Sequence, residues 1–192
     1  MTGAQDVELT HRGVEQARQV GRELDHEYPT AFASALRRSR DTLRLAMEAG
    51  SVVVGKVRWD ERLNERGLGK LELQPSRFEP AYAAGDLKYA PEGGESYEAV
   101  ARRTLSFLID LTDLVKESPA ETILICGHMG PLRILVGILD DAEDPVVVLA
   151  RSFPNAEMMR LRLHQVSIPP FLEDLARVGR QAPVRAVAIV AG

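Results

Sequence analysis

Segments rich in β-branched residues alternate with segments of helical periodicity along this chain. Residues 52–59 and 122–126 predict strands, whereas residues 37–48 and the stretch after Ser96 carry apolar side chains at helical spacing. Each helix buries one apolar stripe and a parallel sheet buries both faces, so such an alternation folds into layers. We therefore expect an α/β fold: a three-layer α/β/α sandwich with a mostly parallel central sheet.

The rest of the chain predicts further elements and one long irregular region. The other expected elements are a helix opening at Thr10, a strand over 31–34, a helix over 130–139, strands near 145–150 and 157–163, a helix near 170–179 and an apolar strand over 184–191. Residues 60–95 are punctuated by glycine and proline and are expected to form a loop or lid, because loops of that length are usually functional. No linker or repeat interrupts residues 1–192, which predicts a single domain.

The composition narrows the classes of partner. The 192 residues are 45% hydrophobic and 27% charged, and their net charge of −4 argues against neutralising many phosphates of duplex nucleic acid. Cys126 is the only cysteine, which excludes an intrachain disulfide and a cysteine-rich zinc site. No apolar run approaches the roughly 20 residues of a membrane span, and no signal-peptide pattern is visible. We expect a cytoplasmic protein with no nucleic-acid and no membrane partner.

Short motifs follow one another in an order that is informative as a whole. They are LTHRGVEQA at 9–17, SALRRSRDT at 34–42, LNERGLG at 63–69 with GGES at 93–96, ILICGHMG at 123–130 and NAE at 155–157. In this order they resemble the histidine phosphatase superfamily, which includes phosphoglycerate mutases and many small phosphatases. The resemblance covers residues 3 to about 163. It implies a phosphoglycerate-mutase-like fold and a phosphorylated small molecule as the partner, with no metal and no cofactor.

The resemblance assigns a phosphate pocket to residues from several motifs. It makes Arg38 the pocket arginine, suited by its planar, permanently charged fork, and His128 the second pocket histidine. His128 lies where a buried strand ends and a helix begins, an edge of α/β sheets at which ligands usually bind. The alternatives are a solvated helix arginine and a core histidine. Ser34, Met129 and Gly130 are expected to bind substrate beside them, with Gly130 allowing close approach and Met129 narrowing the pocket.

Glu65 corresponds to the proton donor of the family, which protonates the oxygen of the leaving group. The alternative is an exposed loop glutamate. Glu95 and Ser96 are expected to order the loop and cap the following helix.

The family's nucleophile is a histidine in an Arg-His-Gly triplet that ends an apolar strand. No such triplet occurs in the sequence, and we expect that the chain begins just after this element. His11 does not replace it, because His11-Arg12-Gly13 has the reverse order and falls in the first turn of a helix.

A missing central strand would leave backbone groups of both neighbouring strands without partners. Residues 184–191 have the length and apolar character to fill that position, as in a circular permutant or an exchange between subunits. The alternative is an ordinary edge or dimer-interface strand.

Three functions follow from these expectations. The first is a phosphomonoester hydrolase or mutase that works through phosphohistidine if an upstream Arg-His-Gly exists. The second is a catalytically inactive relative that binds a phosphorylated ligand or a protein partner. The third, an unrelated α/β protein, requires the ordered motifs to be coincidence. The apolar C-terminal strand is also compatible with a homodimer.

Overall fold

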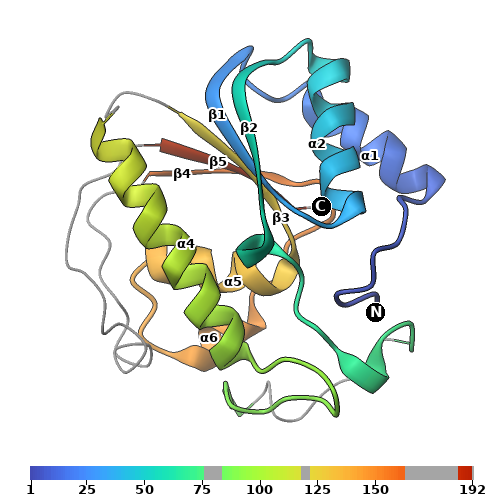
Figure 1. Ribbon diagram of the computed structural model, residues 1–192, viewed down its shortest axis with the longest axis vertical. Helices are drawn as coiled ribbons and strands as arrows, with labels where there is room; N and C mark the ends of the chain where they lie inside the picture. Colours follow the sequence, from blue (N-terminus) through green and yellow to red (C-terminus); the bar gives the residue numbers. More distant parts are fainter. Residues whose placement is uncertain (76–83, 118–121, 163–185, 192) are drawn as a thin grey trace.

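A five-stranded sheet forms the centre of the computed structural model, which describes residues 1–75, 84–117, 122–162 and 186–191. The strands are β1 (Glu27–Ser34), β2 (Val53–Asp60), β3 (Ile123–Gly127), β4 (Met158–Arg162) and β5 (Ala186–Ala191). Their order across the sheet is β2-β1-β3-β5-β4, and only β4 runs antiparallel to its neighbour (Figure 1). The expected mostly parallel sheet is confirmed.

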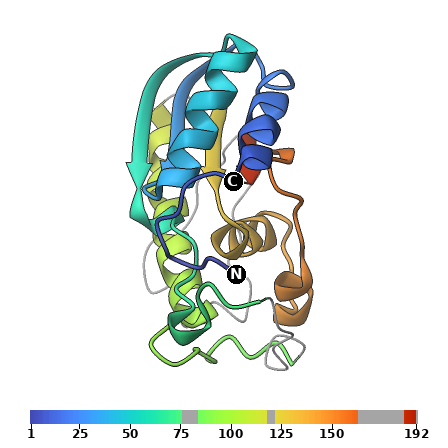
Figure 2. The same ribbon diagram turned by 90° about the vertical axis from the view of Figure 1, so that its right-hand side faces the viewer.

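Helices cover both faces of this sheet. They are α1 (His11–Gly21), α2 (Arg37–Gly50), α4 (Tyr97–Glu117), α5 (Met129–Leu139) and α6 (Pro145–Ala150), with two short 3-10 turns at Glu61–Leu63 and Gly69–Leu71. Figure 2 shows α2 in front of the strands and α4 behind them. The result is the expected three-layer α/β/α sandwich.

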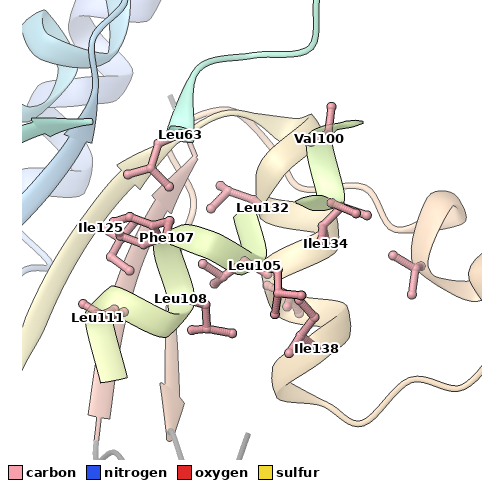
Figure 3. Packing of buried hydrophobic residues seen from close by; sticks show 14 of the residues in the cluster. Leu63, Val100, Leu105, Phe107, Leu108, Leu111, Ile125, Leu132, Ile134 and Ile138 are labelled. Atoms are coloured by element: carbon pink, nitrogen blue, oxygen red, sulfur yellow. The ribbon is translucent and has the colours of Figure 1, made fainter. Parts of the chain in front are cut away.

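The strands alternate their side chains between two hydrophobic cores. In β3, Ile123 and Ile125 belong to the core beneath α4 and α5, whereas Leu124 and Cys126 belong to the core beneath α1 and α2. Every residue of β3 is buried, because successive side chains of a strand point to opposite faces and both faces are covered here. Figure 3 shows the first core, in which side chains of α4, α5 and β3 pack together, among them Phe107, Leu132 and Ile125.

β5 lies inside the sheet. It pairs in parallel with β3, from Ile123 opposite Val187 to Gly127 opposite Ala191, and antiparallel with β4 on its other side. Residues 186–191 are therefore an inner strand and not an edge strand; residues 184 and 185 lie outside the described part. The carboxyl end of β5 comes to the same edge of the sheet as that of β3.

One expected strand is wrong. Residues 145–150 form helix α6, although Val146, Val147 and Val148 favour a strand. Asp144 caps this helix by accepting a hydrogen bond from the Val146 N–H at 2.8 Å, and Pro145 occupies the first helical turn, where its missing N–H costs nothing. The helix expected near 170–179 lies outside the described residues.

β2 forms one edge of the sheet and carries exposed apolar side chains. Val53 and Trp59 are 63% and 51% exposed. The homodimer stays a prediction. Among the described residues, no helix is both long enough and apolar enough to cross a membrane.

Candidate functional site

Three parallel strands end side by side at one edge of the sheet. Ser34 is the last residue of β1, Ala191 ends β5, and His128 directly follows β3 as the N-cap residue of α5. The carboxyl edge of parallel strands is the usual ligand site of such sheets, because loops and helix N-termini meet there. Residues that are far apart in the sequence thus converge on this edge.

His128 is held by a buried hydroxyl. Its side chain is 1% exposed, and its Nε2 lies 2.9 Å from Oγ of Ser34, which is fully buried. The same hydroxyl donates to Oδ1 of Asn64 at 2.7 Å and accepts from the Leu36 N–H at 3.1 Å. Ser34 therefore contacts His128 directly, and its hydroxyl is fully used by these three partners.

Glu65 reaches the start of helix α5. Its Oε1 accepts the Gly130 N–H at 3.0 Å and the Arg66 N–H at 2.8 Å. An added Cβ at Gly130 would lie 2.4 Å from this oxygen, so only glycine allows the carboxyl group to come so close. The sequence predicted that Gly130 allows another group to come close to the backbone. In this structure the group close to Gly130 is the Glu65 carboxyl group.

The environment of Glu65 favours its protonated form. Burial raises the pKa of this carboxyl group above its ordinary value, against the opposing effect of the two backbone hydrogen bonds and of the Arg38 and Arg103 charges. A carboxylic acid with a raised pKa retains its proton at a higher pH, as a general acid must.

Arg38 is buried and faces the N-terminal segment. Its guanidinium donates to the carbonyl oxygens of Gln5 at 2.7 Å and Gly3 at 2.8 Å. Burial lowers its pKa, whereas the nearby charges of Glu65, Asp6 and Glu72 raise it. Arg38 and Glu65 thus lie in one electrostatic environment.

Glu72 fixes the N-terminal segment beside Arg38. Its carboxylate accepts the Ala4 N–H at 2.9 Å, the Leu68 N–H at 3.1 Å and the Gln5 side-chain amide. Burial raises the pKa of Glu72, but these hydrogen bonds outweigh it, so the pKa is lowered overall. The N-terminal segment is therefore held by hydrogen bonds to the ionised carboxylate of Glu72.

Two open pockets flank this segment. One of about 540 Å³ lies beside Glu65; it is lined by Ala4, Glu61, Arg62, Asn64, Glu65, Gly67, Gly93, Gly94, Glu95 and Arg103. A second of about 240 Å³ lies beside Arg38, between the segment and Asn155-Ala156. The charged residues that line the first pocket are three glutamates, Glu61, Glu65 and Glu95, and two arginines, Arg62 and Arg103.

Met129 follows His128 at the start of α5. It is partly buried against the core of α4 and α5, and its Sδ accepts the Phe153 N–H at 3.4 Å. Its expected contact with substrate stays a prediction.

Several residues of the site have no individual signal in the sequence. Asn64 lies within the LNERGLG motif, but only the fold shows that its amide joins Ser34 to the loop. Arg103 donates to Glu95 at 2.8 and 3.0 Å and to the Arg62 carbonyl, which ties α4 to the loop. Arg66 is buried with its guanidinium 4.6 Å from the centre of the Tyr97 ring, a cation–π contact.

The described residues contain no cluster of three or more histidine, cysteine, aspartate or glutamate side chains arranged to hold a metal ion.

The fold and the site together define an α/β protein with a histidine, an arginine and a carboxylic acid at the carboxyl edge of its sheet. The sequence profile of the histidine phosphatase superfamily (branch 1) matches residues 1–167. The chain belongs to this superfamily.

Relatives and solved structures agree with this assignment. The 2,3-bisphosphoglycerate-dependent phosphoglycerate mutase of Methylorubrum populi is 33% identical over 156 residues, covering 72% of this chain and 70% of that protein. The enzyme of that name from Nitrobacter hamburgensis is 31% identical over 187 residues, covering 91% and 89%. A mycobacterial glucosyl-3-phosphoglycerate phosphatase, solved with inorganic phosphate, is similar with a TM-score of 0.61 and 28% identity, covering 79% of this chain and 78% of that one. The similar proteins thus include both mutases and phosphatases.

Proposed function

We propose that this chain acts on a phosphomonoester as a histidine phosphatase or phosphomutase. Arg38 and His128 hold the phosphoryl group at the carboxyl edge of the sheet, and Glu65 is the proton donor. The observation that carries the proposal is Glu65: an acid with a raised pKa, fixed against the N-terminus of α5 and electrostatically coupled to Arg38. No metal and no cofactor takes part.

The residues suit the two halves of the reaction. A transferring phosphoryl group carries negative charge on its oxygens, which donors held in place stabilise. As the bond between phosphorus and the leaving oxygen breaks, that oxygen takes the proton from Glu65, which becomes a carboxylate. The Arg38 charge stabilises that carboxylate.

The phosphohistidine route needs a nucleophile from an Arg-His-Gly triplet, which the 192 residues do not contain. The proposal includes this route only if an upstream segment carries that triplet. In the family the triplet ends an apolar strand, and we expect that strand beside β3. The carboxyl end of β5 lies there in this structure, with Ala191 opposite Gly127. We infer that β5 occupies the position of the family's first strand.

A second candidate is a catalytically inactive member that binds a phosphorylated ligand or a protein partner. It is favoured by the contacts of Arg38, two of whose N–H groups are bound to the carbonyls of Gly3 and Gln5. Hydrogen bonds to charged groups contribute about 1.5–3 kcal/mol each. Two or three of them, less the costs of association, give affinity at about the millimolar level.

Phosphate release from an aryl phosphomonoester, measured together with phosphate binding, separates the two candidates. Release that His128→Ala abolishes, and that exposed His26→Ala leaves unchanged, supports the enzyme. Saturable phosphate binding without release supports the inactive member. If the protein neither binds phosphate nor releases it from the substrate, both candidates are excluded.

A further inference from the structure

Asn64 and Glu65 are consecutive residues of the loop after β2, and their side chains bind to different elements. Oδ1 of Asn64 accepts the Ala35 N–H at 2.9 Å and the Ser34 hydroxyl at 2.7 Å, where β1 ends. Oε1 of Glu65 accepts the Gly130 N–H at 3.0 Å in the first turn of α5. The two side chains therefore join this short piece of loop to β1 on one side and to α5 on the other.

The amide group of Asn64 has a definite orientation. A backbone N–H can only donate, so the Asn64 atom that lies 2.9 Å from the Ala35 N–H is the amide oxygen. This oxygen has two lone pairs, and the fully buried Ser34 hydroxyl uses the second. A side chain without an acceptor at position 64 would break both bonds between the loop and the end of β1.

The hydrogen bonds of Glu65 give its two oxygens different roles. Oε1 accepts two backbone N–H groups, from Gly130 and Arg66, which occupy both of its lone pairs. The protonated carboxyl group therefore carries its hydrogen on Oε2, which has no hydrogen-bond partner in the described part of the chain. Because Glu65 lines the open pocket of about 540 Å³, Oε2 is the oxygen left to donate to a ligand there.

We infer that Asn64 is a positioning residue for Glu65: by fixing the loop to β1, it holds the carboxyl group against α5 with Oε2 left as the donor. The position tolerates little movement. An added Cβ at Gly130 would lie 2.4 Å from Oε1, and a displacement of about 0.5 Å away from α5 would lengthen the 3.0 Å contact beyond the usual range of about 2.7–3.2 Å. Asn64 acts through the backbone, because it directly precedes Glu65 in the chain. Its effect on catalysis rests on the proposed function.

Amide NMR of the free protein tests the positioning without any substrate. The Gly130 N–H is bonded to the Glu65 carboxyl group, so its shift should follow the titration of that group in the unmodified protein. In Asn64→Leu, which has no acceptor, we expect the Gly130 amide proton to move upfield and to lose this pH dependence. Asn64→Asp keeps an acceptor oxygen for β1 and should retain both features. The arginines whose charges act on Glu65, Arg38 and Arg103, are present in all these proteins.

Ser39→Ala is a matched control for the loss of a buried hydrogen bond. Ser39 is fully buried, but its hydroxyl donates to the Cys126 carbonyl at 3.1 Å, so the variant should leave the Gly130 amide unchanged. A Gly130 amide that keeps its shift and its pH dependence in Asn64→Leu overturns the inference. A Gly130 amide that does not titrate in the unmodified protein overturns it as well, whether or not the variants fold.

Leaving groups of different basicity test the consequence for catalysis. An alkoxide needs a proton from the acid in order to leave, whereas 4-nitrophenolate leaves without one. We expect Asn64→Leu to lower kcat/KM about tenfold to a hundredfold for an alkyl phosphate and about twofold or less for 4-nitrophenyl phosphate. Asn64→Asp should lose less on the alkyl phosphate.

Equal losses on the two substrates in Asn64→Leu contradict a role in positioning the acid. If the unmodified protein hydrolyses neither substrate, the catalytic role of Asn64 fails together with the proposed function. The amide measurement needs no turnover, so it still decides whether Asn64 holds Glu65 against α5.

Discussion

The absence of a Cβ atom at Gly130 allows the Glu65 carboxyl group to lie against the backbone of α5. An added Cβ would lie 2.4 Å from Oε1 of Glu65, so Gly130→Ala should displace the carboxyl group from the Gly130 N–H. We expect a loss of about 1–3 kcal/mol in the free energy of unfolding, which exceeds the helix propensity that alanine gains. Denaturant titration measures it. Gly67→Ala is the control, because its Cβ would have 3.8 Å to the nearest atoms; equal losses in the two variants would contradict the account.

The raised pKa of Glu65 predicts a pH dependence of stability. Burial makes the folded protein hold this proton more tightly than the unfolded chain does. The free energy of unfolding therefore falls as the pH rises from the ordinary value of 4.5 through the raised one. Glu65→Gln keeps an acceptor oxygen without the charge, so its stability relative to the unmodified protein should increase over that window.

Urea titrations of both proteins across this pH range measure the difference. Glu23→Gln, at an exposed side chain, should show no such trend. A Glu65→Gln difference that stays constant with pH would show that the carboxyl group is not destabilised by burial.

Sequence reasoning identified Arg38, Glu65 and His128 through their motifs, and the fold brings them to one region. Their roles in catalysis remain predictions. The sequence did not reveal the contact of Ser34 with His128 or the part of Asn64, because both depend on hydrogen bonds between the ends of β1 and β3 and the following loop. Residue type and spacing carry no information about such contacts.

At the scale of elements, α6 shows where local pattern misleads. Three consecutive valines favour a strand, but Asp144 and Pro145 begin a helix. Asp144→Ala should cost about 1 kcal/mol of stability, because it removes the cap to the Val146 N–H. Thermal unfolding measures the loss. Asp144→Asn should be near neutral, and a loss as large as that of alanine would argue against capping.

β5 was predictable as a strand, but its pairing was not, because parallel partners are distant in sequence and come together only through the fold. Its inner position can be tested with Ile189→Pro. Any N–H of an inner strand faces a neighbouring strand, so proline should cost about 1–3 kcal/mol for the bond and the orphaned carbonyl, and more from its ring.

Ile189→Val keeps the N–H and is the control for this change. Chemical denaturation of the two variants compares them. If proline costs no more than valine, β5 does not pair on both sides.

At the scale of the whole molecule, the two hydrophobic cores stabilise the fold, and the carboxyl edge of the sheet carries the candidate site. The cores beneath α4 and α5 and beneath α1 and α2 hold the sheet, and the loops at its carboxyl edge bring the polar residues together. β5 adds a constraint, since one strand fills the space between β3 and β4. In the proposal that β5 takes the position of the family's first strand, an upstream strand with Arg-His-Gly would compete with β5 for that position.

Titration of the protein with inorganic phosphate, followed by backbone amide NMR shifts, tests the central claim most directly. We predict saturable binding at about the millimolar level, with shifts at Ala35, Gly130 and their neighbours. Arg38→Leu should abolish it, and Arg40→Leu, at an exposed arginine of the same helix, should not. Phosphate that leaves these amides unshifted, or that binds Arg38→Leu as well as the unmodified protein, would contradict a phosphate site at this edge of the sheet.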